Sequence, residues 1–386
     1  GQFLGARGHR KRVDARLQRV GLDDLRLELR AHRLDLLGLC RQFLRERIDL
    51  AGLFRQLRAH GLDLLGLFGQ FGFKRVDRPG LFGQLHRDLL DLAGDFSPDI
   101  IHSFHAYKAG RSGLLLRRML GVPLVTTLTG TDINVDLRNP ERRRIIKEVL
   151  NASDLVTVFN DHALSVLIKN GIRRREIRVI HQSVLMPKAQ TVDYRALYNV
   201  GTDERVFLMS GGIRRVKRVG YAIDTLSRVI KVRPEIRLFI AGLVLEQEEY
   251  QRIAKRIRHL PWVHYLGQVP REHMPSLLKS VDMVLNTSAS ESEANAILEA
   301  FYFQKPVVAR SIPGNSSLLT NETGFLFRNK KEFYEKILYV IDHPAALAHV
   351  HKAVKRLMRT TFSFERERSG YASVYETLIG QWRKKE

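Results

Sequence analysis

Short apolar segments alternate with amphipathic segments between residues 98 and 309, and this alternation limits the fold more than any other feature of the chain. A short apolar run bounded by turn residues is typical of a buried strand, and the stretches between the runs have the spacing of amphipathic helices. Strands that alternate with helices indicate parallel sheets, because two parallel strands need a crossover connection. The expected strands are residues 98–104, 123–128, 154–159, 177–180, 205–209, 237–241, 263–266, 281–285 and 306–309.

These elements predict an α/β protein with two domains. Residues 97–187 would form a partial amino-terminal domain and residues 203–360 a second domain, with residues 188–202 as a linker of mixed polarity. Residues 361–386 contain the sequence FSFERERSGYASVYETLI, which predicts a carboxyl-terminal amphipathic helix. The first domain is expected to be incomplete or atypical, because no strand pattern precedes residue 97.

The first 96 residues differ in composition from the rest. They contain no Ser, Thr, Asn, Tyr, Trp or Met, and related hexapeptides such as GLFRQL and GLFGQL recur every 14 residues. Two heptads make 14 residues, so a helical repeat array is one interpretation. Internal glycines argue against long helices, because each costs a helix about 1 kcal/mol. The other interpretation is a low-complexity or wrongly framed segment, because a repeat in the DNA gives a protein repeat in every reading frame. The composition favours the second interpretation.

The chain of 386 residues carries a formal charge of +23 at pH 7. Such a charge attracts phosphate-bearing partners, whether nucleotides, anionic lipids or nucleic acid. The basic residues are scattered in small clusters, which is typical of solvated faces and makes nucleic acid the least favoured of these partners. A single cysteine excludes an internal disulfide, and no apolar run has the length of a membrane span. We expect a cytoplasmic protein without a signal peptide, with peripheral contact to the inner membrane face as the further expectation.

Two carboxylates bracket the segment that follows the strand expected at residues 281–285. Glu291 and Glu299 are eight residues apart, so in one helix they would lie within about 80° of each other around the axis. The hydroxyls of Ser288 and Ser290 would cap this helix, with Glu291 at its amino-terminal end. Backbone N–H groups there suit a phosphate, and carboxylates suit the hydroxyls of sugars. The alternative is an acidic first turn that complements the helix dipole, with Glu299 in solvent.

A second candidate for phosphate binding follows the strand expected at residues 205–209. In the sequence SGGIRRVKR, Gly211 and Gly212 allow close approach of the backbone to a ligand, and Arg214 and Lys217 supply cations for a diphosphate. An ordinary strand-to-helix loop would have the same composition. We favour the phosphate-binding interpretation over the ordinary loop, because the same chain also carries Glu291 and Glu299.

Several of these segments resemble one enzyme family. NTSASESE, AILEA and ARSIPGN resemble the Glu-x7-Glu region of the retaining glycosyltransferases of family 4, and GIRRVK and LTGTD also resemble family segments. The resemblance covers residues 97–386 and is greatest for the subgroup of glycosyltransferase 1 domain-containing protein 1 and the bacterial selenosugar synthases. It implies the GT-B fold, with two Rossmann-like domains, and transfer of a sugar from a nucleotide donor, expected to be a UDP-sugar, to an unidentified acceptor. No metal or other cofactor is expected.

The resemblance also assigns roles to residues. Glu291 would contact the hydroxyls of the donor sugar, Glu299 the ribose, and Arg214 and Lys217 the diphosphate, so that Glu291, Lys217 and Arg214 are the expected catalytic residues. The expected donor-binding residues are Gly211, Gly212, Arg214, Lys217, Gly267, Glu291, Ala294, Asn295, Ala296, Ile297 and Glu299. The chain has Ser292, Glu293 and Ala294 where the commoner family pattern is Gly, Phe, Gly, and this difference leaves the donor sugar open.

The acceptor side is expected in the loops after the strands at residues 98–104 and 123–128. These loops carry His105, Thr129, Gly130 and Asp132. In many members of the family a histidine at the position of Thr129 reaches the reacting sugar. The alternative for residues 129–132 is a turn with a capping aspartate.

Three functions follow from these features. A glycosyltransferase is the leading hypothesis. A protein that binds nucleotide sugar without transferring it is the second, because the first 96 residues lack the strand pattern of an acceptor domain. A basic protein that binds nucleic acid is the third.

Overall fold

The computed structural model describes residues 98–172 and 177–384. The chain divides into one unit of residues 1–96 and another of residues 97–386. Both interpretations of residues 1–96, the helical array and the low-complexity segment, lie outside the described residues.

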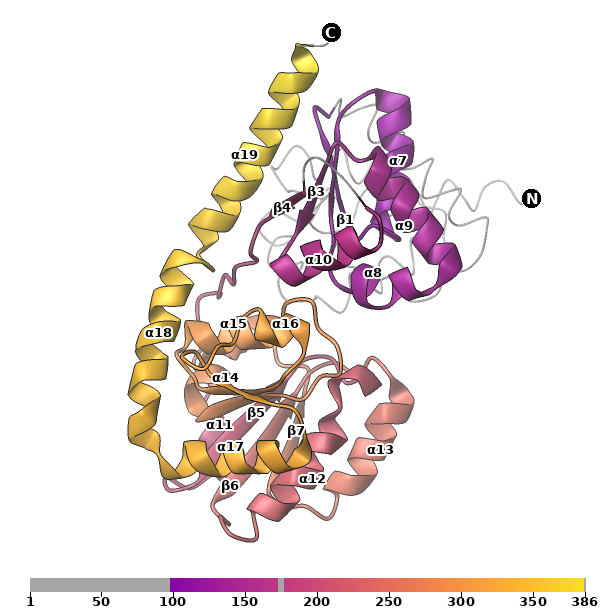
Figure 1. Cartoon of the computed structure of the whole chain (residues 1–386). Coiled ribbons are helices and arrows are strands. Elements are labelled where there is room, and N and C mark those ends of the chain that lie inside the picture. The colour runs from indigo at the N-terminus through magenta and orange to yellow at the C-terminus, as the bar shows by residue number, and fades with distance from the viewer. Residues whose placement is uncertain (1–97, 173–176, 385–386) are drawn as a thin grey trace, which may run out of the picture. The chain divides into compact units, whose positions relative to one another are not determined.

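The first sheet has four parallel strands in the order β1-β2-β3-β4 (Figure 1). These strands are β1 (Ile101–Phe104), β2 (Leu124–Thr127), β3 (Leu155–Val158) and β4 (Ile177–Val179). Their connections contain α7 (Ala109–Leu120), α8 (Thr131–Asn134), η1 (Asp136–Arg138), α9 (Pro140–Ala152) and α10 (Asp161–Lys169). The parallel pairing confirms the four strands predicted in this region, within shorter bounds.

Both faces of the first sheet are buried, which explains why its strands are apolar without alternation. Leu124 and Val156 pack on one face together with side chains of α7, α9 and α10. Val125 and Leu155 pack on the other face against side chains of α19 (Phe364–Arg383). The predicted carboxyl-terminal helix therefore covers the sheet of the amino-terminal domain.

The second sheet has six parallel strands in the order β10-β9-β8-β5-β6-β7. These strands are β5 (Arg205–Ser210), β6 (Ile236–Ala241), β7 (Val263–Gly267), β8 (Met283–Asn286), β9 (Val307–Arg310) and β10 (Phe325–Phe327). The first five confirm the predicted strands. The sixth has only three residues, which is too few for a recognisable pattern in the sequence.

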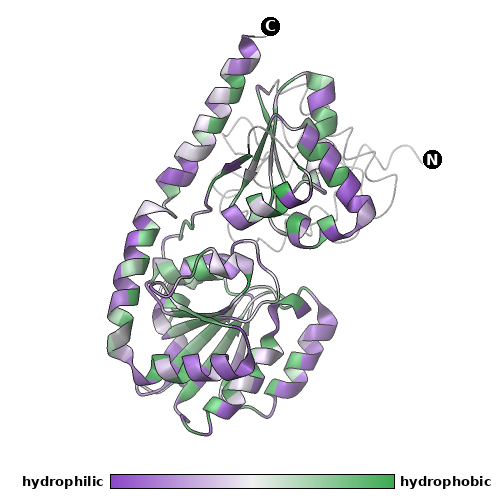
Figure 2. Cartoon of the chain, viewed as in Figure 1, coloured by the Kyte–Doolittle hydropathy of each residue, from purple (hydrophilic) through white to green (hydrophobic). Residues whose placement is uncertain are grey.

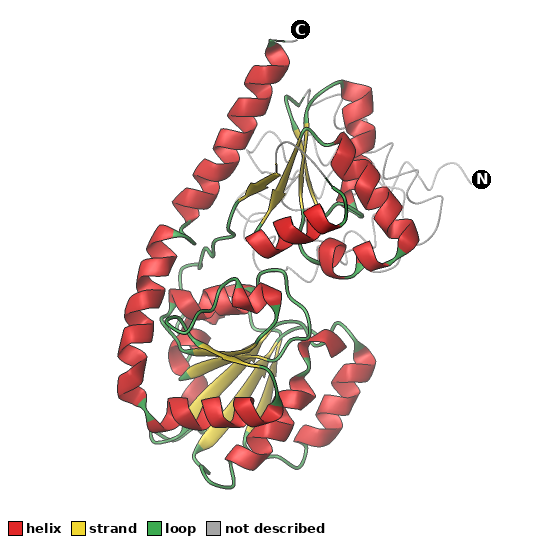
Figure 3. Cartoon of the chain, in the orientation of Figure 1, coloured by secondary structure: helices red, strands yellow, loops and turns green. Residues whose placement is uncertain are grey.

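Helices cover both faces of the second sheet, where two clusters of buried side chains form the core. In chain order the helices are η2 (Arg215–Lys217), α12 (Val219–Val229), α13 (Gln247–Ile257), η3 (Arg271–His273), α14 (Met274–Ser280), α15 (Asn295–Tyr302), α16 (Pro313–Ser316), α17 (Lys330–Asp342), η4 (Pro344–Ala346) and α18 (Leu347–Thr360). The strands are mostly hydrophobic and the helices have mixed faces (Figures 2 and 3). The loops that follow the carboxyl ends of these parallel strands lie at one edge of the sheet. In open α/β sheets this is the edge at which ligands bind.

The interval predicted as a linker, residues 188–202, contains the short helix α11 (Tyr194–Leu197). The side chain of Asp193 caps it by accepting from the backbone N–H groups of Arg195 and Ala196. Tyr194 is buried in the core of the second domain. Part of the interval therefore belongs to that domain, and its helix is too short to give a hydrophobic period in the sequence.

Candidate functional site

The adjacent strands β5 and β8 are followed by the loops that carry Lys217 and Glu291. The Nζ of Lys217 donates to Oε1 of Glu291 over 2.6 Å, and the hydroxyl of Ser288 donates to the same oxygen over 2.6 Å. The side chains of Lys217 and Glu291 are only 17% and 11% exposed, so water screens the pair weakly. Two motifs that lie far apart in the sequence thus meet in one site.

Glycines bring the backbone of the β5 loop close to its neighbours. Gly211 has a φ of +135°, which glycine adopts without strain. A Cβ atom on Gly242, just after β6, would lie 2.0 Å from the carbonyl oxygen of Gly211. A Cβ atom on Gly211 would lie 3.3 Å from Cε of Lys217. Because Gly211 has no side chain, it leaves space for the side chain of Lys217 to reach Glu291.

Thr287 fastens the β8 loop to the β5 loop. Its hydroxyl donates to the carbonyl oxygens of Lys217 and Arg218, over 2.9 and 3.1 Å. The backbone N–H of Ala289 also donates to the carbonyl oxygen of Val216 over 2.8 Å. The segment that carries the cations is thereby held against the segment that carries the carboxylate.

Arg214 lies in the same β5 loop, just before η2. Its Nε atom is buried and has no hydrogen-bond partner among the described residues. An unpaired buried donor is costly, more so when it is charged. A bound anion at this position would remove that cost.

The predicted helix at Glu291 begins later than expected. α15 starts at Asn295, and its N-cap is Ala294, which makes no side-chain bond. The expected capping by Ser288 and Ser290 is wrong, because no side chain caps α15 and the hydroxyl of Ser288 binds the carboxylate of Glu291 instead. Glu291 lies in the loop before the helix, so it does not share a helical face with Glu299, and the expected angle between them does not apply. Residues 294–297, predicted to bind the donor, form the first turn of α15, which no side chain caps.

Glu299 lies within α15 and is partly buried. Burial raises its pKa to about 7, because removal from water disfavours the charged form, while the positive charge of Arg271 acts in the opposite direction. A carboxyl group in this state would gain hydrogen bonds from ligand hydroxyls and become easier to ionise.

Two further predicted donor residues, Gly212 and Gly267, support the same edge of the sheet. A Cβ atom on Gly212 would lie 2.3 Å from Cδ1 of Leu245. Gly267 has a φ of +70°, and its carbonyl oxygen accepts from the N–H of Gly242 over 2.7 Å. Their role in the described structure is to pack and shape the loops.

Asp132, predicted as an acceptor residue, is fully buried. Its carboxylate accepts from the backbone N–H groups of Ala106, Gly130 and Ile133 over 2.8 to 3.1 Å, and from that of Thr129 as well. The oxygens of Asp132 therefore join the loop after β1 to the loop after β2. These bonds agree with the alternative interpretation of residues 129–132 as a turn held by an aspartate, and the acceptor role of Asp132 stays a prediction.

Gly130 and His105, from the same two loops, are also enclosed. A Cβ atom on Gly130 would lie 2.4 Å from Cβ of Ser292, so the backbone of Gly130 packs closely against Ser292. His105 has a φ of 87° and a side chain that is 11% exposed. Burial lowers the pKa of His105, and the nearby carboxylates of Asp132 and Asp136 offset this effect in part. Of the four predicted acceptor residues, Thr129 and His105 keep some exposure.

Several polar residues of the site were not predicted. Asn286, at the end of β8, accepts from the N–H of Ser288 over 3.0 Å and is buried. Asn134 and Asn160, from the first domain, donate to the carbonyl oxygens of Glu291 and Ser292. Asn160 also caps α10, because its side-chain oxygen accepts from the backbone N–H of Ala163 over 3.0 Å. Nothing in the sequence marks its second contact.

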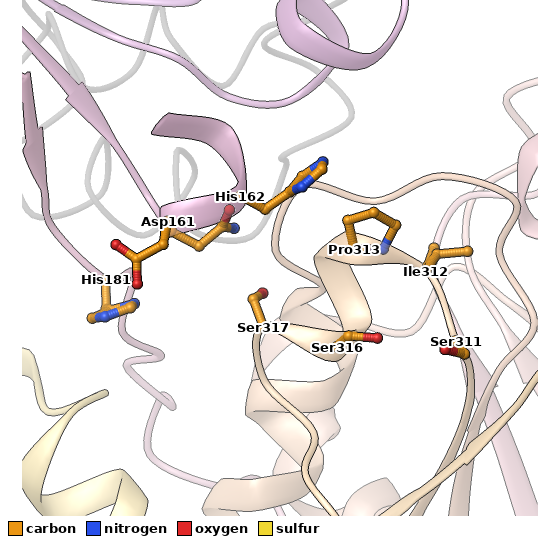
Figure 4. A pocket seen from close by; sticks show the side chains of 9 residues that line it. Asp161, His162, His181, Ser311, Ile312, Pro313, Ser316 and Ser317 are labelled. Carbon is orange, nitrogen blue, oxygen red and sulfur yellow. The ribbon is translucent and has the colours of Figure 1, made fainter. Parts of the chain in front are cut away.

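A pocket of about 530 Å³ lies beside this site rather than at it (Figure 4). It adjoins the Glu291 loop, because Asn160, which lines it, binds the carbonyl oxygen of Ser292. Figure 4 shows Asp161 and His181 on one side of the space, and Ser311, Ile312 and Pro313 on the other. The lining residues are Asn160, Asp161, His162, His181, Ser311, Ile312, Pro313, Ser316 and Ser317. Of these, Ser311, Ile312 and Pro313 belong to the segment ARSIPGN, which the sequence analysis compared with the Glu-x7-Glu region of the family.

Within residues 98–172 and 177–384, no group of three or more His, Cys, Asp or Glu side chains is placed to hold a metal ion. None of the helices in that part of the chain combines the length and the apolar character that crossing a membrane requires.

Two family models match most of the chain. The model described as Glycosyltransferase Family 4 matches residues 2–184, and the model described as Glycosyl transferases group 1 matches residues 193–357. The first match extends into residues 1–96, where the sequence analysis expected no resemblance. The second contains the loops of Lys217 and Glu291.

Individual proteins show the same similarity. Glycosyltransferase 1 domain-containing protein 1 of Xenopus tropicalis is 29% identical over 282 residues, covering 71% of this chain and 79% of that protein. N-acetyl-alpha-D-glucosaminyl L-malate synthase of Bacillus anthracis is 23% identical, covering 59% of this chain and 61% of that protein. The crystal structure of Anabaena HepE in complex with UDP and glucose has a TM-score of 0.68 and 22% identity, covering 76% of this chain and 82% of that one. The predicted two-sheet architecture is therefore confirmed.

Proposed function

We propose that the chain, which matches the models described as Glycosyltransferase Family 4 and Glycosyl transferases group 1 over successive parts of its length, transfers a sugar from a UDP-sugar to an acceptor with retention of configuration. The observation that carries this proposal is the contact between Lys217 and Glu291. It joins a cationic loop and an acidic loop at the carboxyl edge of one parallel sheet, where ligands of such folds bind. HepE, which has the same fold, was crystallised with UDP and glucose.

In the proposed reaction, the bond between the anomeric carbon and the diphosphate oxygen breaks, and its electron pair goes to the diphosphate. The acceptor oxygen forms the new bond and gives its proton to the departing diphosphate. The protein must therefore stabilise negative charge on the diphosphate and positive charge on the sugar. Preorganised donors aimed at the developing charge are the most effective way to do so.

Lys217 and Arg214 are the proposed ligands of the diphosphate. Both lie in the β5 loop, and the unpaired Nε of Arg214 is a donor ready for a phosphate oxygen. The first turn of α15 adds backbone N–H groups and the positive end of the helix dipole. We propose that these groups act without a metal ion.

The two glutamates are proposed to hold the sugars. Glu291, already bound to Lys217 at 2.6 Å, would accept from hydroxyls of the transferred sugar beside the diphosphate. Glu299 would accept from the ribose hydroxyls, which would compensate the burial of its carboxylate. Thr129, at the end of the loop after β2, is the proposed contact on the acceptor side.

A screen of nucleotide release tests the reaction class. The full chain is incubated with a panel of UDP- and GDP-sugars and candidate acceptors, and the released nucleotide is measured by mass spectrometry. We expect UDP, and a product whose anomeric configuration by NMR equals that of the donor. Release of GDP alone would overturn the proposed base, an inverted product would overturn retention, and binding without release would support the non-catalytic alternative.

Calorimetric titration with UDP tests the donor residues independently of catalysis. We expect Lys217→Ala and Glu299→Ala each to weaken UDP binding at least about tenfold, because each removes hydrogen bonds that involve a charged group. Lys279→Ala and Glu335→Ala are matched controls, because both side chains are exposed on other helices of the same domain. Unchanged affinity in the first pair would contradict the assigned roles.

A further inference from the structure

The loop that carries Glu291 is held from the first domain through its backbone. The side-chain amide of Asn134 donates to the carbonyl oxygen of Glu291 over 3.1 Å, and that of Asn160 donates to the carbonyl oxygen of Ser292 over 2.9 Å. Asn134 ends α8, and Asn160 precedes α10, so the two donors come from the loops after β2 and β3. Two adjacent strands of the first sheet therefore reach the same dipeptide.

The next residues of the loop make further contacts of this kind. The carboxylate of Glu293 accepts from the backbone N–H of Gln182 over 3.0 Å, and the side-chain amide of Gln182 donates to Oδ1 of Asn295 over 2.7 Å. The side chain of Glu293 is fully buried, and burial raises its pKa. Residues 291–295 thus have a partner from residues 98–182 at four of five positions.

Glu291 is held by groups from both domains. Its carbonyl oxygen is bound by Asn134, and its carboxylate by Lys217 and Ser288 of the second domain. A Cβ atom on Gly314 would lie 2.3 Å from that same carbonyl oxygen, so the backbone of α16 packs closely against it. The direction of the Glu291 side chain therefore depends on groups from both domains.

We propose that Asn134 and Asn160 are positioning residues that hold Glu291 in the orientation required for sugar transfer. This inference rests on the proposed function. The loop has no helical hydrogen bonds of its own before α15, so the two asparagine amides supply order that the local sequence lacks. A displacement of about 1 Å at a reacting centre is enough to lower a rate about 100-fold. The donor-binding groups Lys217, Arg214 and Glu299 are outside the contact.

The substitution Asn160→Asp isolates this contact. Oδ1 of Asn160 caps α10 by accepting from the N–H of Ala163 over 3.0 Å, and an aspartate retains that bond. The Nδ2 donor, which holds Ser292, is replaced by an oxygen that repels the carbonyl. Asn139→Asp is the matched control, because Asn139 caps α9 in the same way, from Arg142, and is exposed.

Hydrogen exchange and kinetics of the full chain together test the proposal. We expect the backbone amides of residues 291–295 to exchange about tenfold faster in Asn160→Asp than in Asn139→Asp. We expect kcat for UDP release to fall about tenfold while the Kd for UDP stays within twofold. A purely structural role would change both together. If Asn160→Asp does not fold, as judged by circular dichroism, Asn134→Asp is used with the same expectations.

Equal exchange in Asn160→Asp and Asn139→Asp would overturn the positioning role, whatever the activity of the chain. Faster exchange without a change in kcat would also overturn it, because the loop would be held without consequence for transfer. Failure of the wild-type chain to release any nucleotide would refute the proposed function instead. The exchange experiment would still decide whether the two asparagines hold the loop.

Discussion

The two glutamates of the site, although only eight residues apart, meet different environments. Glu291 is paired with a lysine at 2.6 Å, so its charge is compensated within the protein. Glu299 is partly buried and forms no such pair within the described residues, and burial raises its pKa to about 7. The first carboxyl group is held in place by a lysine, and the second is a group whose charge depends on pH and on what binds it.

Donor binding should therefore depend on pH through Glu299. Hydroxyl groups that donate to the carboxylate favour its ionised form, so the bound complex has a lower pKa than the free protein. We expect the affinity for UDP-glucose to rise between pH 6 and pH 8. It should level off above pH 7, because the pKa of Glu299 in the protein without ligand is about 7. Calorimetry in buffers of different ionisation enthalpy should show proton release near pH 7.

Glu299→Gln provides the control for this prediction, because it retains the shape of the side chain and cannot ionise. It should remove the dependence on pH between 6 and 8. A wild-type affinity that falls across this range would contradict the assignment of Glu299 to the ribose. A raised folded pKa also means that ionisation costs stability as the pH rises through 7, so Glu299→Gln should be the more stable protein at pH 8.

At the scale of elements, α19 makes a half-buried polar contact with the first sheet in addition to its apolar packing. Nδ1 of His102 lies 2.6 Å from the hydroxyl of Tyr375, and its Nε2 lies 2.6 Å from the hydroxyl of Thr127. Val374 and Leu378 of α19 are buried beside them. Burial lowers the pKa of His102 to about 4, so the imidazole is neutral in the folded protein at pH 7.

This pKa predicts a loss of stability in mild acid. An unfolded histidine titrates near 6.5, so below that pH the unfolded chain binds a proton that the folded chain does not, down to about pH 4. The free energy of unfolding should fall by about 1 kcal/mol between pH 7.5 and 5.5 on this account. Urea unfolding followed by circular dichroism measures it.

His102→Gln should flatten this part of the pH profile while lowering stability at pH 7, because one of the two hydroxyl contacts is lost. His349→Gln, on the exposed face of α18, should leave both unchanged. If His102→Gln has the wild-type profile between pH 7.5 and 5.5, then α19 is not held through a neutral His102.

At the scale of the whole molecule, the formal charge of +23 attracts any polyanion, whereas the Lys217–Glu291 site suits one small anion. The two forms of binding differ in their response to salt, because a polyanion releases many counterions and a nucleotide sugar few. The salt dependence of binding therefore distinguishes the glycosyltransferase hypothesis from the nucleic-acid hypothesis.

We expect the Kd for UDP-glucose to change less than about fivefold between 0.05 and 0.2 M salt, whereas any affinity for duplex DNA should fall at least about 100-fold. At 0.15 M salt, excess DNA should not displace UDP-glucose. Fluorescence anisotropy with labelled DNA, in competition with UDP-glucose, measures both. Tight DNA binding that persists at 0.2 M salt would support a nucleic-acid function for the chain.

Local pattern determined the elements of this protein. Strands of the second sheet such as β5 and β8 are apolar because both faces of the sheet are covered, and a continuous apolar run depends only on neighbouring residues. The cations of the β5 loop and the acids after β8 are also visible in the sequence as groups that suit phosphate and sugar. Their identity needs no tertiary information.

Only the tertiary structure decided which of these groups meet. Lys217 and Glu291 are 74 residues apart and become neighbours because β8 pairs with β5 rather than with β7. Asp132 has the residue type of a site carboxylate, yet four backbone N–H groups occupy it. Partners at such separations depend on strand order and on burial, which no local pattern contains.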